Sequence, residues 1–143
     1  MYSLREGQKS DLPRVLELIN ELALYEKAPE QVTNTLERME KEGFGPQPVY
    51  GFFVCVKDSS QEIIGIAVYY YRYSTWKGQT MYLEDIIVTE SMRGKGIGRM
   101  LIEQLIQEAK EKGFKRITCF FFFKQKTAYE IASGDWSSDV CSS

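Results

Sequence analysis

The sequence predicts one α+β domain, in which a mostly antiparallel sheet is flanked by helices. A length of 143 residues suits a single domain with a substantial hydrophobic core. Two helical patterns come first and three strand patterns follow with no helix between them, which favours an antiparallel meander. One more helix and one more strand come next, which favours a single parallel pair formed by a right-handed crossover. The predicted order is β-α-α-β-β-β-α-β.

The first third of the chain is predicted to hold one short strand and two helices. Residues 2–5 are the strand candidate, and Ser10 and Asp11 shortly before Pro13 are typical of a helix start. Apolar residues at helical spacing then predict one buried face that continues to about Leu24. They are Leu12, Val15, Leu16, Ile19, Leu22 and Ala23.

A shorter helix and the remaining strands complete the pattern. Asn34 with Glu37 three residues later is typical of a helix cap, and Gly43 is predicted to end this second helix. The strand candidates are rich in β-branched and aromatic residues. They cover 50–57, 63–73, 80–88 and 116–120, with a predicted helix over 99–112 before the last of them.

Composition argues against several classes of protein. A net charge of −2 and a pI near 5.3 give no electrostatic sign of nucleic-acid binding. There is no histidine, which excludes histidine-bound metals and Ser-His or Cys-His pairs, and the three cysteines lack metal-like spacing, so no metal is expected. The sequence shows neither a signal-peptide core nor an apolar run of membrane-spanning length. We therefore expect a cytoplasmic protein with no membrane partner.

The central motif is the turn Arg93-Gly94-Lys95-Gly96-Ile97-Gly98, which joins strand 80–88 to helix 99–112. The first N–H groups of a helix are unpaired and carry partial positive charge, and glycines let phosphates approach the backbone. The sequence has no P-loop spacing, and G-x-G-x-G differs from the G-x-G-x-x-G of dinucleotide-binding turns. The remaining pattern is Arg-x-x-Gly-x-Gly between an antiparallel meander and a helix.

This pattern, preceded by Leu83-Glu84-Asp85-Ile86-Ile87-Val88, resembles the acetyl-CoA pyrophosphate loop of the GNAT N-acetyltransferase superfamily. Further matches resemble the diamine (spermidine/spermine) acetyltransferase family and span residues 1 to about 119. They are Glu21-Leu22-Ala23, Tyr25-Glu26, Gly43-Phe44-Gly45, Tyr69-Tyr70, Trp76, Tyr82 to Asp85 and Arg93 to Gly98. The resemblance implies the GNAT fold, acetyl-CoA as donor, a small cationic primary amine as acceptor and a homodimer.

The resemblance also implies roles for particular residues. Glu84 is the catalytic candidate, because acetyl transfer to an ammonium first requires loss of a proton, here to a carboxylate through water. Neighbours on a regular strand point to opposite faces, so Glu84 and Asp85 share a cleft only if the strand bulges. The implied substrate-binding residues are Tyr25, Glu26, Glu84 and Asp85. The implied cofactor-binding residues are Ile86, Ile87 and Val88 through their backbone groups, and Arg93, Gly94, Lys95, Gly96, Ile97, Gly98 and Arg99.

The function expected is acetyl transfer from acetyl-CoA to a primary amine of a polyamine or diamine, by direct attack in a ternary complex. Two alternatives stay open. One is a thialysine or lysine-like amino-acid N-acetyltransferase. The other is a non-catalytic acyl-CoA-binding sensor with the same fold. The aromatic group Tyr69, Tyr70, Tyr71, Tyr73 and Trp76 is interpreted as core and hairpin packing rather than pocket wall.

The last stretch changes character. We interpret residues 1–120 as an incomplete N-acetyltransferase domain and 121–143 as a foreign or disordered tail, because the tail resembles a translated sequencing adapter. The family's acid that protonates the leaving thiolate is a tyrosine beyond the final strand, and no residue matches it, since Tyr129 falls in the tail. We expect the 143-residue chain itself to be inactive or unstable.

Overall fold

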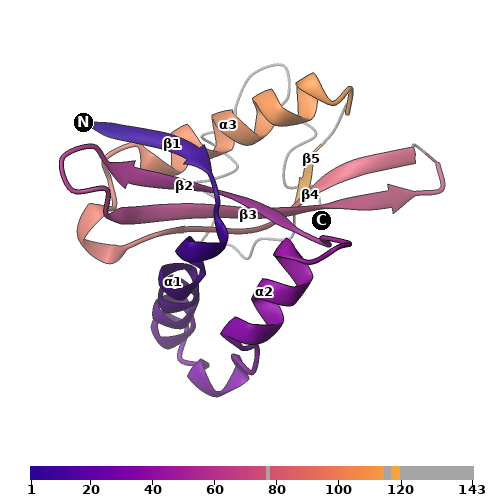
Figure 1. Cartoon of the computed structure of the whole chain (residues 1–143). Coiled ribbons are helices and arrows are strands. Elements are labelled where there is room, and N and C mark those ends of the chain that lie inside the picture. Colours follow the sequence, from indigo (N-terminus) through magenta and orange to yellow (C-terminus); the bar gives the residue numbers. More distant parts are fainter. Residues whose placement is uncertain (77, 115–116, 120–143) are drawn as a thin grey trace.

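A five-stranded sheet with helices on both faces forms the body of the protein (Figure 1). The computed structural model describes residues 1–76, 78–114 and 117–119. The strands lie side by side in sequence order. They are β1 (Tyr2–Glu6), β2 (Gly51–Lys57), β3 (Ile63–Ser74), β4 (Gly78–Val88) and β5 (Ile117–Cys119).

The strand pairing confirms the predicted mixed sheet. The first four strands form an antiparallel meander, and β5 pairs parallel to β4, with Met81 opposite Ile117 and Leu83 opposite Cys119. The far halves of β3 and β4 extend beyond the rest of the sheet as a long hairpin (Figure 1). Arg116, Phe120 and the predicted tail 121–143 lie outside the described residues.

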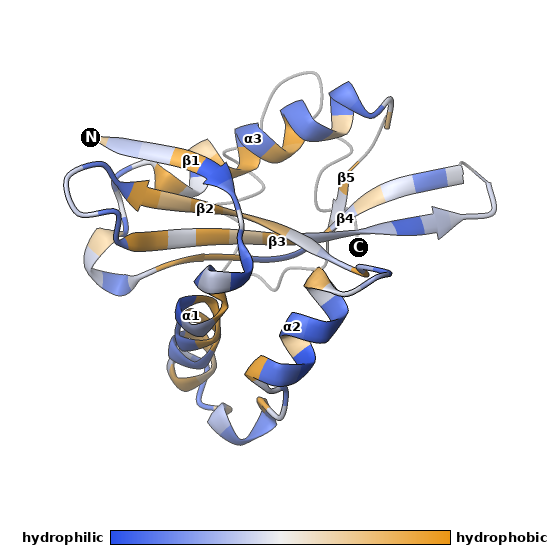
Figure 2. Cartoon of the chain, viewed as in Figure 1, coloured by the Kyte–Doolittle hydropathy of each residue, from blue (hydrophilic) through white to orange (hydrophobic). Residues whose placement is uncertain are grey.

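In the described part of the chain three α-helices cover the sheet, α3 on one face and α1 and α2 on the other (Figure 1). Their bounds are α1 (Leu12–Tyr25), α2 (Leu36–Phe44) and α3 (Ile97–Glu111). One short 3-10 turn precedes each of the three helices: η1 (Lys9–Asp11) before α1, η2 (Pro29–Gln31) before α2 and η3 (Glu90–Met92) before α3. Figure 2 shows apolar residues concentrated in β2 and β3, whereas the helices alternate apolar and polar residues.

Each face of the sheet carries its own apolar core. Leu101, Ile102 and Leu105 of α3 pack on one face against β3, β4 and β5. Leu12, Val15 and Leu18 of α1 pack on the other face against β2 and β3, together with Met39 of α2. Leu18 is fully buried although the predicted apolar face omitted it, whereas Leu16, Ile19 and Leu22 are only partly buried. The sheet is therefore held from both sides.

The predicted helix boundaries need correction. The Asp11 carboxylate does not cap α1 but forms a two-point ion pair with Arg5 at 2.8 and 3.0 Å and accepts the backbone N–H of Gln8. The N-cap of α2 is Thr35, not Asn34, because the Thr35 hydroxyl accepts the N–H of Arg38.

Two glycines also behave differently from the prediction. Gly43 lies inside α2, which continues to Phe44 with Gly45 as its C-cap. A Cβ at Gly43 would lie 2.5 Å from Cζ of Tyr50, so the Tyr50 ring leaves no room for a side chain there. Helix α3 begins at Ile97 with Gly96 as its N-cap, two residues before the predicted start. Gly98 therefore belongs to the first turn of α3, which brings the helix N-terminus into the glycine-rich motif itself.

Candidate active site

A bulge in β4 brings two carboxylates onto one part of the sheet. Asp85 pairs with Val68 and Leu83 pairs with the next residue of β3, Tyr69, so Glu84 is an extra residue in β4. A bulge breaks the strict alternation of side chains along a strand. Glu84 is exposed and Asp85 is partly buried. The bulge therefore allows the side chains of Glu84 and Asp85 to share one cleft, although the two residues are adjacent on the strand.

The pKa of Asp85 shows how closely the acidic side chains gather. Burial first, and then the negative charges of Glu84 and Glu26, raise the pKa of Asp85 to about 7. Glu26 directly follows α1, so the linker after α1 faces the same space as the bulge. Repulsion among carboxylates favours a cationic ligand, which would relieve it. The structure thus brings together three of the four predicted substrate-binding residues.

Tyr25, the fourth of them, lies toward the glycine-rich loop. The guanidinium of Arg93 stands over the Tyr25 ring, 5.2 Å from its centroid, in cation–π geometry. Tyr25 as a whole residue is 59% exposed and is therefore accessible to a ligand. Lys27, just beyond, has a positive φ of 61°, an uncommon conformation for a residue with a side chain. The linker is therefore tightly turned at this point.

Tyrosines border the acidic side chains along β3 and β4. Burial and the charge of Glu84 raise the pKa of Tyr70, which places Tyr70 beside Glu84. The Tyr70 and Tyr82 rings meet at 5.0 Å, and Arg72 stands over Tyr82 at 5.3 Å. Tyr70 was interpreted as packing; its position gives it access to the acidic site as well. Sequence reasoning missed this role because it depends on strand register: Tyr70 lies opposite Tyr82, on the face of the sheet that carries Asp85.

The glycine-rich loop has the geometry of an anion cradle. Gly94 and Gly96 have positive φ values of 80° and 83°, which residues with side chains rarely adopt. A Cβ added at Gly94, Gly96 or Gly98 would meet no atom within 4 Å, so open space lies over the loop. No side chain caps the start of α3. The N–H groups of its first turn and its dipole therefore face that space, as a pyrophosphate requires.

The three predicted cations of the loop have different surroundings. The Arg93 side chain is directed toward the end of β4, because its Nε donates a hydrogen bond to the Val88 carbonyl at 3.1 Å. Arg99 pairs with Glu103 at 3.3 Å on the exposed surface of α3. Lys95 is exposed, and no partner of its ammonium is found in the described part of the chain. Lys95 is thus the cation of the loop that can move most freely toward a phosphate.

Residues Ile86 to Val88 lie on the stretch of β4 that has one strand neighbour among the described residues. They pair with Ala67, Ile66 and Gly65 of β3. On the other side, β5 reaches β4 only at Met81, Tyr82 and Leu83. Among the described residues no strand pairs with this side of β4 beyond Leu83, and Arg93 occupies the Val88 carbonyl.

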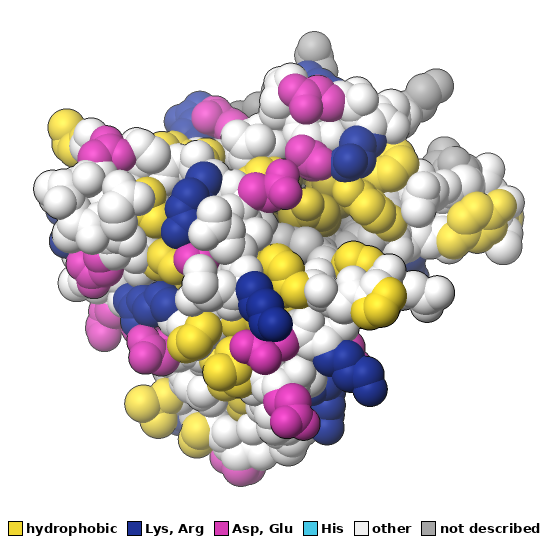
Figure 3. Space-filling view, viewed as in Figure 1, with side chains coloured by type: hydrophobic (Ala, Val, Ile, Leu, Met, Phe, Trp, Pro, Cys, Tyr) yellow, Lys and Arg dark blue, Asp and Glu magenta, His cyan; other side chains and the backbone are white. Residues whose placement is uncertain are grey.

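The described residues contain neither a metal-binding cluster nor a membrane-spanning helix. In residues 1–76, 78–114 and 117–119, no group of three or more His, Cys, Asp or Glu side chains is arranged to hold a metal ion. No helix in that part of the chain is long and apolar enough to cross a bilayer. On the face seen in Figure 3, acidic and basic side chains intermingle rather than gather by sign.

Comparison with known proteins identifies the family. The model of the acetyltransferase (GNAT) family matches residues 12–130. The chain is 38% identical over 143 residues to thialysine N-epsilon-acetyltransferase of Bos taurus, covering 96% of this chain and 84% of the relative. It is 33% identical over 113 residues to spermidine/spermine N(1)-acetyltransferase-like protein 1 of Homo sapiens, covering 76% of this chain and 16% of that protein. The chain belongs to the GNAT acetyltransferase family.

Solved structures agree with this fold. An aminoglycoside acetyltransferase from an uncultured soil metagenomic sample, in complex with sisomicin, superposes with a TM-score of 0.72 at 21% identity, covering 92% of this chain and 84% of that chain. A protein from Clostridium acetobutylicum described as a predicted acetyltransferase, solved with acetyl-CoA, gives a TM-score of 0.75 at 17% identity, covering 94% of this chain and 91% of that chain. Family and named relatives support the predicted acetyl-CoA-dependent N-acetyltransferase activity. The predicted boundary at residue 120 stays a prediction.

Proposed function

We propose that residues 1–119 belong to an enzyme that transfers the acetyl group of acetyl-CoA to the primary amine of a small aliphatic cation, by direct attack in a ternary complex. The observation that carries the proposal is that β4 joins two complementary features. Its bulge holds Glu84 and Asp85, and its end leads into the anion cradle of Gly94, Gly96 and the α3 N-terminus. Amine and donor would therefore meet along one strand.

The acidic side chains serve the amine. Glu84, Asp85 and Glu26 attract the ammonium, and Tyr25 or Tyr70 offers an aromatic face beside it. Glu84 is exposed and accepts the ammonium proton through water, which leaves a neutral nitrogen with a free electron pair. That nitrogen attacks the thioester carbonyl carbon. The carbon–sulfur bond then breaks, the new amide nitrogen loses its extra proton, and the thiolate takes up one proton and leaves as the CoA thiol.

The anion cradle serves the donor. Gly94, Gly96 and the first turn of α3 would hold the pyrophosphate, with Lys95 at the rim, and the free edge of β4 would pair with the pantetheine arm. Acetyl-CoA supplies the activated thioester when bound. The acid for the leaving thiolate is not assigned among the described residues, since the family's tyrosine falls beyond Cys119.

Two acceptor classes fit the site, and each has its own support. Three gathered carboxylates favour a polyamine or diamine, which carries several positive charges. The thialysine acetyltransferases among the relatives favour a lysine-like amino acid instead, and its carboxylate would need a cation such as Arg72 or Arg93. Both share a terminal primary amine on an aliphatic chain.

The test measures CoA thiol released from acetyl-CoA with spermidine, putrescine or thialysine as acceptor. It compares the 143-residue chain with the protein whose residues after Cys119 follow the re-sequenced gene. We expect release with at least one amine from the re-sequenced protein and a large loss in Glu84→Gln. Tight CoA binding without release for any amine would instead support an acyl-CoA sensor. Unchanged turnover in Glu84→Gln would remove Glu84 from the mechanism.

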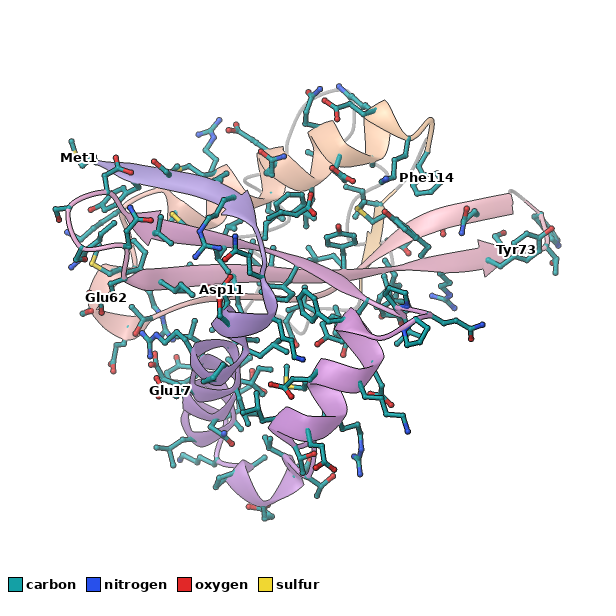
Figure 4. The ribbon with its side chains drawn as sticks, viewed as in Figure 1. Met1, Asp11, Glu17, Glu62, Tyr73 and Phe114 are labelled. Carbon is teal, nitrogen blue, oxygen red and sulfur yellow. The ribbon has the colours of Figure 1, made fainter. Side chains whose placement is uncertain are left out.

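The homodimer implied by the resemblance is also part of the proposal. The hairpin of β3 and β4 carries aromatic side chains that the described fold leaves exposed, Trp76 at 93% and Tyr73 at 74%, and Figure 4 shows Tyr73 at the hairpin tip. Packing of these two residues within the domain, the interpretation from sequence, is therefore wrong. Exposed aromatics of this kind favour a partner surface, here a second copy. Cytoplasmic location stays a prediction.

A further inference from the structure

The end of α1 is fastened to the segment that enters the glycine-rich loop. The Glu21 carboxylate accepts the Thr89 hydroxyl at 3.1 and 3.3 Å and the backbone N–H of Glu90 at 3.0 Å. These hydrogen bonds join positions 68 and 69 residues apart in the sequence. The N–H of Glu90 starts η3, so Glu21 caps the turn that directs the chain toward Arg93.

A second contact lies one helical turn further along the same side of α1. Residues four apart on a helix face the same way, so Tyr25 follows Glu21 on that side. The Tyr25 ring meets the Arg93 guanidinium, and Arg93 is also bound to the Val88 carbonyl. The segment 89–93 is therefore attached to α1 near both of its ends.

The two contacts connect the two halves of the proposed site. Segment 89–93 continues directly into the anion cradle, and α1 ends at Tyr25 and continues into Glu26, whose charge acts on Asp85. A ligand that fixes the loop restricts Arg93, and through Tyr25 and Glu21 it also restricts the end of α1. By linkage, an amine that orders the end of α1 must favour donor binding by the same factor.

We infer that Glu21 is a positioning residue that couples acetyl-CoA binding to the order of the Tyr25–Glu26 linker. This inference rests on the proposed function for its ligands. It adds a residue that touches neither ligand, and it makes the affinity for the amine depend on the presence of CoA.

The test uses hydrogen exchange on the 143-residue chain with and without CoA. In the parent protein, CoA is expected to slow exchange of the amides near the end of α1, residues 22–26, by about twofold or more, because local opening there becomes rarer. Glu21→Gln is expected to abolish this effect, since an amide offers one acceptor oxygen in place of two. CoA affinity, measured by calorimetry, is expected to change by less than about threefold, well under the range typical of direct coupling.

Matched variants separate positioning from general damage. Glu17→Gln changes a glutamate one turn earlier on α1 that points outward and pairs with Arg14 on the surface (Figure 4), so it should behave like the parent. Thr89→Val removes the hydroxyl donor and should reproduce the loss, whereas Thr89→Ser keeps a hydroxyl and should restore the effect.

Three outcomes would overturn the inference. In the first, CoA protects the amides of α1 equally in Glu21→Gln and in the parent. In the second, Glu17→Gln loses this protection as fully as Glu21→Gln does. In the third, Thr89→Ser loses it as completely as Thr89→Val. If the first outcome occurs and CoA still binds, the coupling is contradicted and the proposed function is unaffected. Failure of the parent to bind CoA at all would contradict both. Protection that persists while no amine is acetylated by the protein with the re-sequenced residues after Cys119 would uphold the coupling and contradict only the proposed reaction.

Discussion

Glu84 and Asp85, adjacent in sequence, share one position in the ladder between β3 and β4, because the bulge gives Glu84 no cross-strand partner of its own. The pair therefore acts as one electrostatic unit: burial, together with the charge of Glu84, raises the pKa of Asp85 to about 7 and holds a proton on it near neutral pH. A proton held in this way is released when a cation arrives.

Amine binding should release protons. A bound ammonium favours the charged form of Asp85 and lowers its pKa from about 7, so binding strengthens as pH rises from 6 toward 8. Calorimetric titration of spermidine or thialysine at pH 6.5, in two buffers with different ionisation enthalpies, measures the proton count. Asp85→Asn should remove the proton release, and Glu62→Gln, on a distant surface pair with Lys57, should keep it. Equal proton release in Asp85→Asn and parent would argue against this role.

Asp85 should also make stability depend on pH. Its folded-state pKa is raised, so the unfolded chain loses this proton near pH 4 and the folded protein keeps it until about pH 7. The free energy of unfolding therefore falls as pH rises through this window. Asp85→Asn has no such penalty and should gain Tm relative to the parent at pH 8 but not at pH 4. Thermal melts at pH 4 and pH 8 measure the Tm difference between Asp85→Asn and the parent. A larger gain in Tm at pH 4 than at pH 8 would contradict the predicted pH dependence.

Gly98→Ala should separate stability from ligand binding. A Cβ at position 98 meets no protein atom, and alanine favours the first turn of α3 by up to about 1 kcal/mol, so Tm should hold or rise. The added methyl group would occupy the open space over the loop, so CoA affinity should fall at least about tenfold, by about 1.4 kcal/mol. Calorimetry with CoA measures the loss. An unchanged affinity would place the pyrophosphate elsewhere.

Gly43→Ala should lower stability, in contrast to Gly98→Ala. In an exposed helix interior alanine stabilises, but here its Cβ would lie 2.5 Å from Cζ of Tyr50, whose hydroxyl donates to the Met39 carbonyl at 2.7 Å. The ring must shift, and we expect a loss of about 1–3 kcal/mol, as for other overpacked sites. Urea unfolding of this variant beside Gly98→Ala tests the contrast. A more stable Gly43→Ala protein would show that the ring moves freely.

The sequence predicted the order of elements and the loop because these depend on local signals. Strand periodicity, glycines and helix-start residues are visible within a few positions. The bulge at Glu84 depends on register against β3, and the contact of Arg93 with Tyr25 joins segments far apart in the chain. The cap of α2 moved by one residue because Thr35 and Asn34 are both capable caps, and backbone geometry decided between them. Leu18 became core because packing on the sheet favoured its side of α1.

The most direct test of the account is the product formed by the re-sequenced protein, which is the protein whose residues after Cys119 follow the re-sequenced gene. Mass spectrometry should detect an N-acetylated amine when acetyl-CoA is supplied with spermidine or thialysine. The product should be nearly absent with Glu84→Gln and unchanged with Glu62→Gln. It should be absent with the 143-residue chain, because we propose that the tail after residue 120 does not supply the acid. Acetylated amine at the parent rate from Glu84→Gln, or no acetylated amine from the re-sequenced protein with any amine tested, would contradict the account.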